Sequence, residues 1–252
     1  MKKNTEGLIM MERVVGDKSR LLTILTRDNG VVNCFVRNKY QHNSSQMLAT
    51  RELSYARLSI FYGRNANTLD EASLIQTFLD MELTVSRVSL IHYFFELVIK
   101  TIPEQSDSSE QLDLLLNCLY LIKQGRPLPL IKTVFEIRFA MLGGWMPHLL
   151  YCADCGTYED ETMHFYYEDN ILRCSKCHGE GLYCSLSKGA LAAFRYVVFA
   201  DPKKIFSFQV SPDSFRQLSD CAEKYITSIV SIPLGTLDYY HKYLPPDPTQ
   251  TT

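Results

Sequence analysis

Two Cys-x-x-Cys pairs are the residues of this chain whose types and spacing are best suited to chemistry. Cys152 and Cys155 form the first pair, Cys174 and Cys177 form the second, and eighteen residues separate the pairs. This spacing is typical of a tetrahedral zinc site, although four buried thiols could share it by coincidence. A shell of four thiolates leaves no position for water or substrate, so we expect a structural Zn²⁺ that fastens a polar segment.

No other pattern in the sequence indicates a catalytic site. His178 follows Cys177 and could replace or contact a ligand, but four thiolates already complete the shell, so we expect an exposed ring. The sequence contains no His-Glu-x-x-His and no Gly-x-Ser-x-Gly motif, and GDKS at Gly16 lacks the first glycine of a P-loop. We therefore predict that the protein is not an enzyme.

Basic residues concentrate near the N-terminus, although the whole chain has a formal charge of −2. Residues 1–64 hold eleven Lys and Arg against five Asp and Glu, so they carry +6 and the rest of the chain carries −8. Barrels that bind single-stranded nucleic acid combine positive charge with aromatic stacking surfaces. Taken singly, each charge also fits a solvated face and each aromatic fits a core. The candidate contacts are Arg20, Arg27, Arg37, Lys39, Arg51 and Arg57, and the wider set includes Arg13, Arg64, Phe35, Tyr55, Phe61 and Tyr62.

Residues 1–80 are predicted to form a small β-barrel that carries these charges. Apolar and β-branched runs recur up to Tyr62, and Asp28-Asn29-Gly30 separates two of them. An Asn-Gly turn between two such runs is a strong hairpin signal, because both turn residues accept a positive φ. Several short strands in about sixty residues favour a barrel. The segment QHNSSQ, residues 41–46, is expected to be an exposed loop.

The pattern changes to a helical period after Thr68. Apolar residues recur at helical spacing over 86–100, 108–123 and 129–144. Ser108 with Gln111 suggests a capping box at the start of the second helix. Further helices are expected beyond the cysteines and should return to the same bundle. The predicted architecture is α+β and multidomain: barrel 1–80, helical domain 81–150 and 181–244, zinc-binding insert 151–180, and disordered tail 245–252.

The remaining cysteines and the apolar runs indicate a cytoplasmic protein. Cys34, Cys118, Cys184 and Cys221 are scattered through apolar segments, where cysteine behaves as a small hydrophobe, so we expect a reducing compartment. The N-terminus has no apolar core of a signal peptide. The longest uncharged run, residues 139–153, is interrupted by Gly, Pro and His, so no membrane-spanning helix is expected.

Four segments together resemble the RecO family of bacterial recombination mediators and DNA repair proteins. They are GDKSRLLTILTRDNGVVNCFVRN, HYFFELVIKTIPEQ, LDLLLNCLYLI and FEIRFAMLGGWMPHLLYCADCG. The last is the most specific, because it joins a helix to the first cysteine pair with the family's order and spacing. The resemblance implies an N-terminal OB-fold, an α-helical domain and a zinc-binding insert.

The resemblance also implies a function. The protein would bind single- and double-stranded DNA, promote annealing, and with RecR load recombinase onto strands coated by single-strand binding protein, in the cytoplasm at the nucleoid. One departure is the segment RNKYQHNSS, which keeps Arg37 and Lys39 but lacks other charges of the family's basic loop, so the barrel is expected to bind DNA more weakly. Lys132 is the nearest basic residue to the family's site for the acidic tail of single-strand binding protein.

Two other classes of function are consistent with parts of the sequence. One is a protein-binding adaptor that zinc holds together and that contacts DNA only incidentally. The depleted basic segment and the acidic remainder of the chain favour this adaptor. The other is a zinc-dependent hydrolase or nuclease, against which the closed thiolate shell argues.

Overall fold

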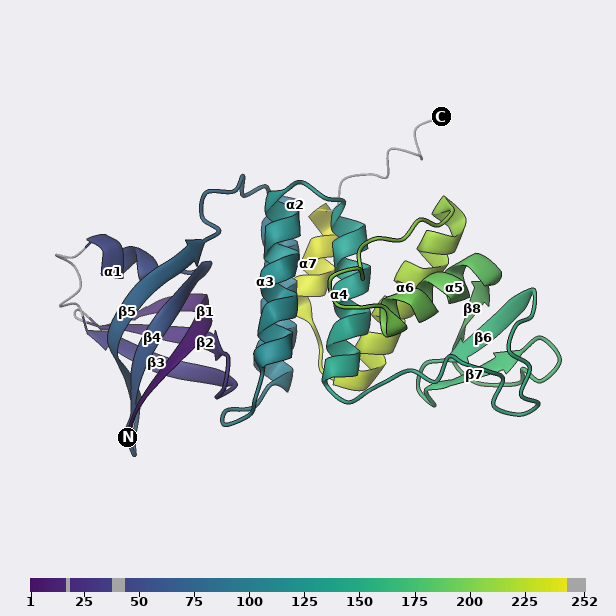
Figure 1. Ribbon diagram of the computed structural model, residues 1–252, viewed down its shortest axis with the longest axis horizontal. Coiled ribbons are helices and arrows are strands. Elements are labelled where there is room, and N and C mark those ends of the chain that lie inside the picture. The colour runs from purple at the N-terminus through teal and green to yellow at the C-terminus, as the bar shows by residue number, and fades with distance from the viewer. Residues whose placement is uncertain (17–18, 38–43, 244–252) are drawn as a thin grey trace. The chain divides into compact units, whose positions relative to one another are not determined.

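The alternating residues of the N-terminal segment form five strands that close on themselves. The computed structural model describes residues 1–16, 19–37 and 44–243. The strands are β1 (Lys2–Val15), β2 (Ser19–Thr26), β3 (Val31–Arg37), β4 (Ser54–Tyr62) and β5 (Asn67–Thr77). Their order is β1-β2-β3-β5-β4, and β4 pairs with β1, so the sheet closes into a barrel (Figure 1).

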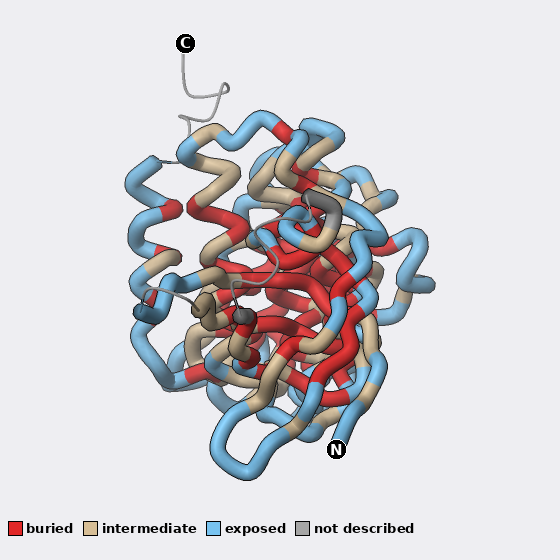
Figure 2. Tube along the Cα trace, turned by 90° about the vertical axis from the view of Figure 1, so that its left-hand side faces the viewer, coloured by how far each residue is buried: buried red, intermediate tan, exposed pale blue. Residues whose placement is uncertain are grey.

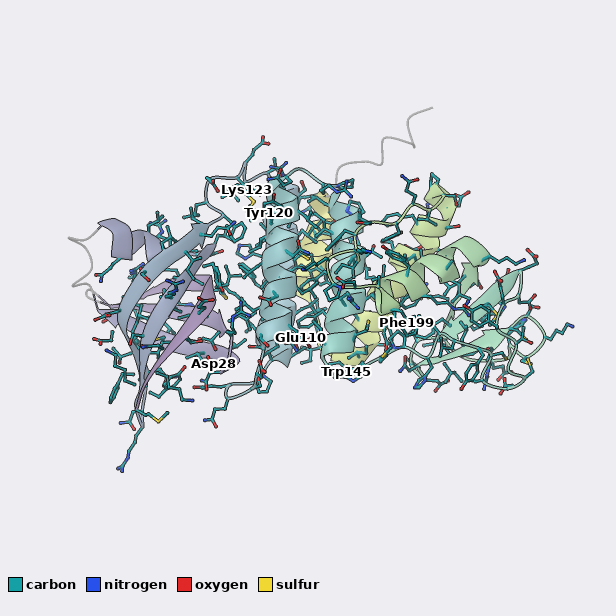
Figure 3. The ribbon with its side chains drawn as sticks, viewed as in Figure 1. Asp28, Glu110, Tyr120, Lys123, Trp145 and Phe199 are labelled. Atoms are coloured by element: carbon teal, nitrogen blue, oxygen red, sulfur yellow. The ribbon has the colours of Figure 1, made fainter. Side chains whose placement is uncertain are left out.

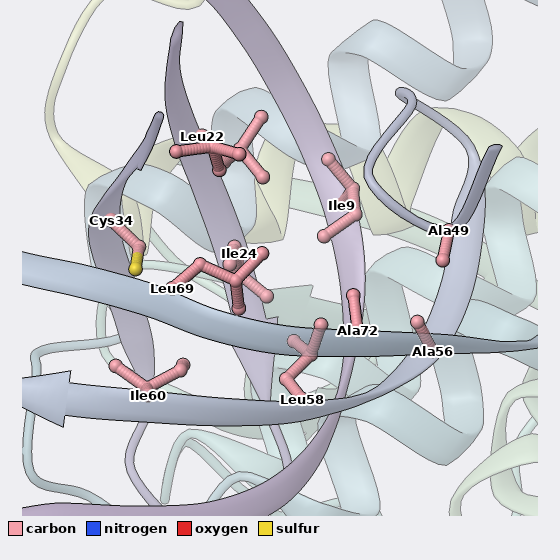
Figure 4. Packing of buried hydrophobic residues seen from close by; sticks show 11 residues of the cluster. Ile9, Leu22, Ile24, Cys34, Ala49, Ala56, Leu58, Ile60, Leu69 and Ala72 are labelled. Carbon is pink, nitrogen blue, oxygen red and sulfur yellow. The ribbon is translucent and has the colours of Figure 1, made fainter. Parts of the chain in front are cut away.

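The side chains that point into the barrel from these strands are removed from water. Ile9, Leu22, Ile24, Cys34 and Ile60 are fully buried in this core (Figure 4). Buried positions follow one another along the strands, as Figure 2 shows by colour. Burial of each such aliphatic side chain contributes roughly 1.5–3 kcal/mol, which fixes which face of each strand is inside.

The predicted hairpin between β2 and β3 is confirmed. Gly30 adopts φ +67°, which its lack of a side chain permits. A Cβ at Gly30 would lie 1.9 Å from the carbonyl oxygen of Pro103, so the turn also needs glycine for close packing. The amide of Gln105 donates to the carbonyl of Asn29 at 3.0 Å, which joins the turn to the loop after helix α2 (Val85–Thr101).

Two features of the barrel differ from the sequence-based expectation. The segment 41–46 was expected to be an exposed loop, but helix α1 (Ser44–Ala49) covers its second half, while 41–43 lie outside the described residues. The helix ends at Ala49, which is buried in the barrel core. Strand β5 was not anticipated, because its sequence alternates weakly and its pairing with β4 contains two register shifts.

Three helices group with the barrel. They are α2 (Val85–Thr101), α3 (Ser109–Lys123) and α7 (Gly235–Tyr243). Ser108 precedes α3 as predicted but makes no side-chain cap; its hydroxyl donates instead to the carbonyl of Thr26 at 2.6 Å. Helix α7, which the sequence pattern did not reveal, lies on α2, and its Thr236 amide donates to the carboxylate of Glu96 at 3.0 Å.

The remaining elements form a second unit around helix α4 (Leu128–Leu142). Both predicted ends of this helix are confirmed, with proline in the first turn and Gly143 at the C-cap. Strands β6 (Thr162–Tyr166), β7 (Ile171–Cys174) and β8 (Tyr183–Ser187) form a sheet ordered β7-β6-β8. Helices α5 (Lys188–Phe199) and α6 (Pro212–Val230) follow, and both contact α4. The hydroxyl of Ser211 caps α6 by accepting from the amide of Ser214.

The chain therefore divides into two compact units. Met1–Gln124 and the chain from Leu234 onward form the first, and Gly125–Pro233 form the second. The second contains the four predicted metal ligands. Among residues 1–16, 19–37 and 44–243, no helix has the length and apolarity needed to cross a membrane. The expected disordered tail, 245–252, lies outside the described residues.

Candidate metal centre and nucleic-acid interface

The four predicted ligands converge on one point of the second unit. Cys152 and Cys155 lie in the turn before β6, and Cys174 and Cys177 lie at the end of β7. Their sulfur atoms all lie within 4.8 Å of one another, and the Sγ atoms of Cys155 and Cys174 are 3.6 Å apart. None of the chain's eight cysteines forms a disulfide. The structure thus brings together the four cysteines that the spacing selected.

The backbone around these thiols forms two tight turns suited to metal binding. The amide of Gly156 donates to the carbonyl of Cys152 at 2.9 Å, and the amide of His178 donates to that of Cys174 at 3.0 Å. The hydroxyl of Thr157 lies 3.2 Å from Cys155 Sγ, and its hydrogen bond is the largest of several that together lower the pKa of Cys155 to about 6. A metal tetrahedron with bonds of about 2.3 Å needs sulfur atoms roughly 3.8 Å apart, so the four cysteines could hold one metal ion.

Aromatic packing attaches the cysteine-bearing segment to the helices that follow it. Phe165 of β6 is fully buried and meets Phe194 of α5 edge-on, with ring centroids 5.5 Å apart. It meets Tyr225 of α6 in the same way at 5.2 Å. His178 is exposed, as predicted, and its ring lies 4.4 Å from that of His164. The turns that carry the four cysteines are therefore attached to a packed sheet, whose strand β7 ends at Cys174.

Glu12 neutralises two of the predicted DNA contacts. Its carboxylate lies 2.6 Å from the guanidinium of Arg20 and 3.4 Å from that of Arg51. Arg20 also donates to the hydroxyl of Thr50 at 2.7 Å. A phosphate would have to compete with Glu12 for either arginine, because both charges are already engaged.

Glu6 has the same effect on the other side of β1. Its carboxylate lies 3.8 Å from Arg27 and 3.4 Å from Arg57, and it accepts a hydrogen bond from the hydroxyl of Tyr55. This hydrogen bond is the largest of the effects that lower the pKa of Glu6. Arg27 forms a second ion pair, with Asp113 at 2.8 Å. Four of the six candidate DNA contacts thus have carboxylate partners.

The other two candidates are Arg37, in β3, and Lys39. Arg37 is the last residue of that strand, opposite Ser19 of β2. Lys39 lies outside the described residues. Both DNA contacts therefore stay predictions.

The outer face of β1, β2 and β3 presents a groove that the sequence analysis did not single out. One rung of cross-strand neighbours runs over the three strands through Arg13, Leu21 and Phe35. Met11, Thr23 and Asn33 form the neighbouring rung. We refer to these six residues, with Asn65 and Asn67 at the edge of the groove, as the rung face.

The rung face combines an accessible ring with positive charge that pairs with no described carboxylate. Phe35 is only partly buried, and Arg13 is exposed. Neither Arg13 nor Arg64, which adjoins Asn65 in the chain, forms an ion pair with another described residue. The period-2 alternation of β2 and β3 could have located this face, because inward Leu22 and Cys34 require their neighbours to face outward.

Lys132 does not lie on an exposed basic rim. The residue is 3% exposed, and its Nζ lies 2.7 Å from Glu136 and 2.6 Å from Glu223. Glu136 is fully buried one helical turn further along α4, and Glu223 belongs to α6. Lys132 therefore joins α4 to α6 inside the second unit, and an incoming peptide cannot reach its charge without disturbing that packing.

Comparisons with known proteins agree along nearly the whole chain. The family model described as Recombination protein O N terminal matches residues 1–78, and the one described as Recombination protein O C terminal matches residues 83–238. The chain is similar to the DNA repair protein RecO of Acetivibrio thermocellus, with 27% identity over 237 residues, which cover 93% of this chain and 94% of that protein. It is similar to the DNA repair protein RecO of Alkaliphilus metalliredigens, with 25% identity over 224 residues, which cover 88% of this chain and 91% of that protein.

Proposed function

The chain belongs to the RecO family of DNA repair proteins, and from this we propose that it acts as a recombination mediator. In this role it binds single- and double-stranded DNA, promotes annealing of complementary strands, and with RecR helps load recombinase onto strands coated by single-strand binding protein. The role needs a grip on DNA that does not depend on base sequence, and it needs no catalytic group.

The observation that carries the proposal is the rung face of the barrel. Phe35 offers a flat ring on which a base can stack, and Arg13 lies in the same groove with no described carboxylate as its partner. The exposed Arg64 directly precedes Asn65 at the edge of the groove and is a second candidate phosphate contact. Stacking on an aromatic ring is worth about 1–3 kcal/mol per base and tolerates any sequence. Arg37, the last residue of β3, and Lys39 are retained as further candidate contacts.

The architecture that supports this role follows from the strand order. A five-stranded closed sheet ordered β1-β2-β3-β5-β4 suits the OB-fold, whose second and third strands commonly face nucleic acid. We retain residues 1–80 as the DNA-binding domain, with the helical domain at 81–150 and 181–244. We also propose that the four cysteines hold a structural Zn²⁺, which suits a closed set of thiolates.

Annealing in the absence of nucleotide tests the proposed function. Labelled single-stranded DNA is titrated with the protein, and a complementary strand is then added. We expect binding and accelerated duplex formation, and we expect Phe35→Ala to weaken both by about tenfold through loss of one stacked base. Phe61→Ala is the matched control, because Phe61 is an exposed aromatic on β4, 52% accessible, outside the rung face. Strand cleavage or absence of binding would contradict the proposal.

The ion pairs of the barrel favour a second candidate function, the protein-binding adaptor. Glu6, Glu12 and Asp113 engage four arginines that a strong DNA-binding face would leave available. An adaptor would bind RecR or the tail of single-strand binding protein while showing no annealing. We still propose that the helical domain holds the site for this tail, but Lys132 is not an exposed charge of that site. Binding of a tail peptide by a variant that has lost annealing would support this second function.

A further inference from the structure

A segment of the second unit exposes large apolar side chains although its backbone is firmly held. Trp145, Met146, Leu150 and Tyr151 have exposed fractions of 42%, 44%, 50% and 59%. Tyr158, after the first cysteine pair, is 59% exposed. We call these five residues the apolar strip. Trp145 lies just beyond the C-terminal end of α4 (Figure 3).

Buried side chains fix the first half of the strip. The hydroxyl of Tyr225, itself 1% exposed, lies 3.0 Å from the carbonyl oxygen of Trp145 and donates to it. The side-chain amide of Asn170 donates to the carbonyl of Met146 at 2.8 Å. The amide of His148 in turn donates to the carbonyl of Asn170 at 3.3 Å. Trp145 and Met146 are thus partly exposed on a backbone that these hydrogen bonds hold in place, and the Trp145 ring lies against Gly143.

Arg195 of α5 fixes the second half. Its guanidinium donates to the carbonyls of Leu149 at 2.8 Å, Leu150 at 3.0 Å and Tyr158 at 2.6 Å. It also lies over the ring of Tyr158, 4.1 Å from the centroid. The positive charge of Arg195 is therefore engaged within the chain. Leu150 and Tyr158 are brought together around it although eight positions separate them in the sequence.

The surroundings of the strip are acidic. Residues 145–182 contain seven Asp and Glu against two Lys and Arg, a formal charge of −5. Glu159 directly follows Tyr158, and Asp169 directly precedes Asn170; both carboxylates are exposed. One of the two basic residues, Arg173, pairs with Asp154 at 3.0 Å. A ligand that reaches the apolar strip therefore meets negative charge at its edge.

We propose that the apolar strip is a docking surface for a positively charged protein segment with apolar side chains. Tryptophan, tyrosine and methionine are enriched at the centres of protein interfaces, where rigid side chains lose little conformational entropy on binding. The acidic edge repels DNA and acidic peptides and attracts Lys and Arg, so charge complementarity selects the partner. The surface is separate from the rung face of the barrel and requires no DNA.

The intrinsic fluorescence of the full chain reports directly on this surface, because Trp145 is its only tryptophan. The probes are a short peptide of Lys, Leu and Val, without aromatic residues, and the same peptide with Glu in place of Lys. We expect the cationic peptide to shift the emission to shorter wavelength and to bind at least tenfold more tightly than the acidic one, with an affinity that falls with salt. An equal response to both peptides, or no shift with the cationic one, would overturn the proposal.

Matched variants separate this surface from general attraction to an acidic protein. The double variant Leu150→Ser, Tyr151→Ser should bind the cationic peptide about tenfold more weakly. Phe199→Ser, at a residue 50% exposed on α5, should leave the affinity for this peptide unchanged. Glu159→Lys with Asp169→Lys should abolish the preference for the cationic peptide, and Glu110→Lys on α3 should keep it. Equal weakening by the strip variant and by Phe199→Ser would refute the docking surface. Annealing by the strip variant should be unchanged, so failure here is distinct from failure of the proposed function.

Discussion

Arg27 and Asp113 form an ion pair that joins the β2–β3 hairpin to helix α3. The Arg27 Nη2 and Asp113 Oδ1 atoms are 2.8 Å apart, and the two side chains are 34% and 63% exposed. The hydrogen bond to Asp113 is the largest of the effects that raise the pKa of Arg27. Because water screens the pair, its contribution to stability is at most about 0.5–1 kcal/mol. The charge of Arg27 is thus used to position the hairpin.

Replacing Asp113→Asn tests whether this arginine also contacts DNA. We expect the free energy of unfolding, measured by urea denaturation, to fall by about 0.5 kcal/mol. The affinity for single-stranded DNA should stay within about twofold, because the proposed path follows the rung face. Glu110→Gln, on the same helix, controls for the change in net charge. A tenfold gain in affinity for Asp113→Asn alone would place Arg27 on the DNA path.

Arg13→Gln combined with Arg64→Gln should weaken binding to all DNA sequences alike. Each phosphate contact contributes about 0.7 to the slope of log affinity against log salt for single strands, so loss of two contacts should flatten the slope by about 1.4. The melting temperature should change little, because neither side chain is paired with another described residue. An unchanged slope would favour Arg37 and Lys39 as the phosphate contacts instead.

Local signals explain why parts of the fold were predictable. The Asp28-Asn29-Gly30 turn, the proline at the start of α4 and Ser211 before α6 act within a few residues of where they stand. The four cysteines could also be predicted, because the spacing of metal ligands can be read directly from the sequence. Each of these features needs no knowledge of which distant segments meet.

Features that depend on distant contacts were not predictable. Glu6 lies 51 positions from Arg57, and Lys132 lies 91 positions from Glu223, so only the folded register reveals these pairs. Ser108 has the sequence of a helix cap, yet the carbonyl of Thr26, 82 positions away, takes its hydrogen bond. A list of basic residues therefore overestimates a DNA-binding surface when carboxylates on neighbouring strands compensate the charges.

Lys132→Met should be strongly destabilising. The substitution leaves Glu136, which is fully buried, without its lysine partner, and removing one member of a buried ion pair typically costs about 3–5 kcal/mol. The double variant Lys132→Met, Glu136→Leu should recover most of this loss, because no uncompensated buried charge remains. Urea denaturation of the two variants checks the difference. Equal stability of Lys132→Met and the original chain would mean that the lysine is not buried between these carboxylates.

The His92–Glu52 pair should make stability depend on pH. His92 Nε2 lies 3.2 Å from Glu52, and this hydrogen bond raises the pKa of His92. The pair then stabilises the fold below about pH 6.5, the unfolded value, and the contribution is lost as the pH rises through the higher pKa of the folded state.

His92→Gln should therefore lower the free energy of unfolding in mildly acidic solution and have little effect in alkaline solution. The side chain is 42% exposed, so the expected loss is below about 1 kcal/mol. Urea denaturation near pH 5.5 and near pH 9, for both proteins, gives the comparison. A larger effect at the alkaline pH would contradict the assigned ion pair.

Metal analysis should find one zinc per chain, held by the four cysteines. Cys155→Ser removes an exposed ligand with little loss of packing, so this variant should lose the metal while the barrel keeps its structure. Cys184→Ala is the control, because Cys184 lies on β8 outside the cluster and should keep full occupancy. Zinc released per chain is measured with a thiol-modifying reagent and a metal-sensitive dye.

Chelation should loosen the turns at Cys152 and Cys174 but leave Phe165 packed against Tyr225. The second unit should therefore become more susceptible to protease around the turns. Full zinc content in Cys155→Ser would rule out the proposed ligand set.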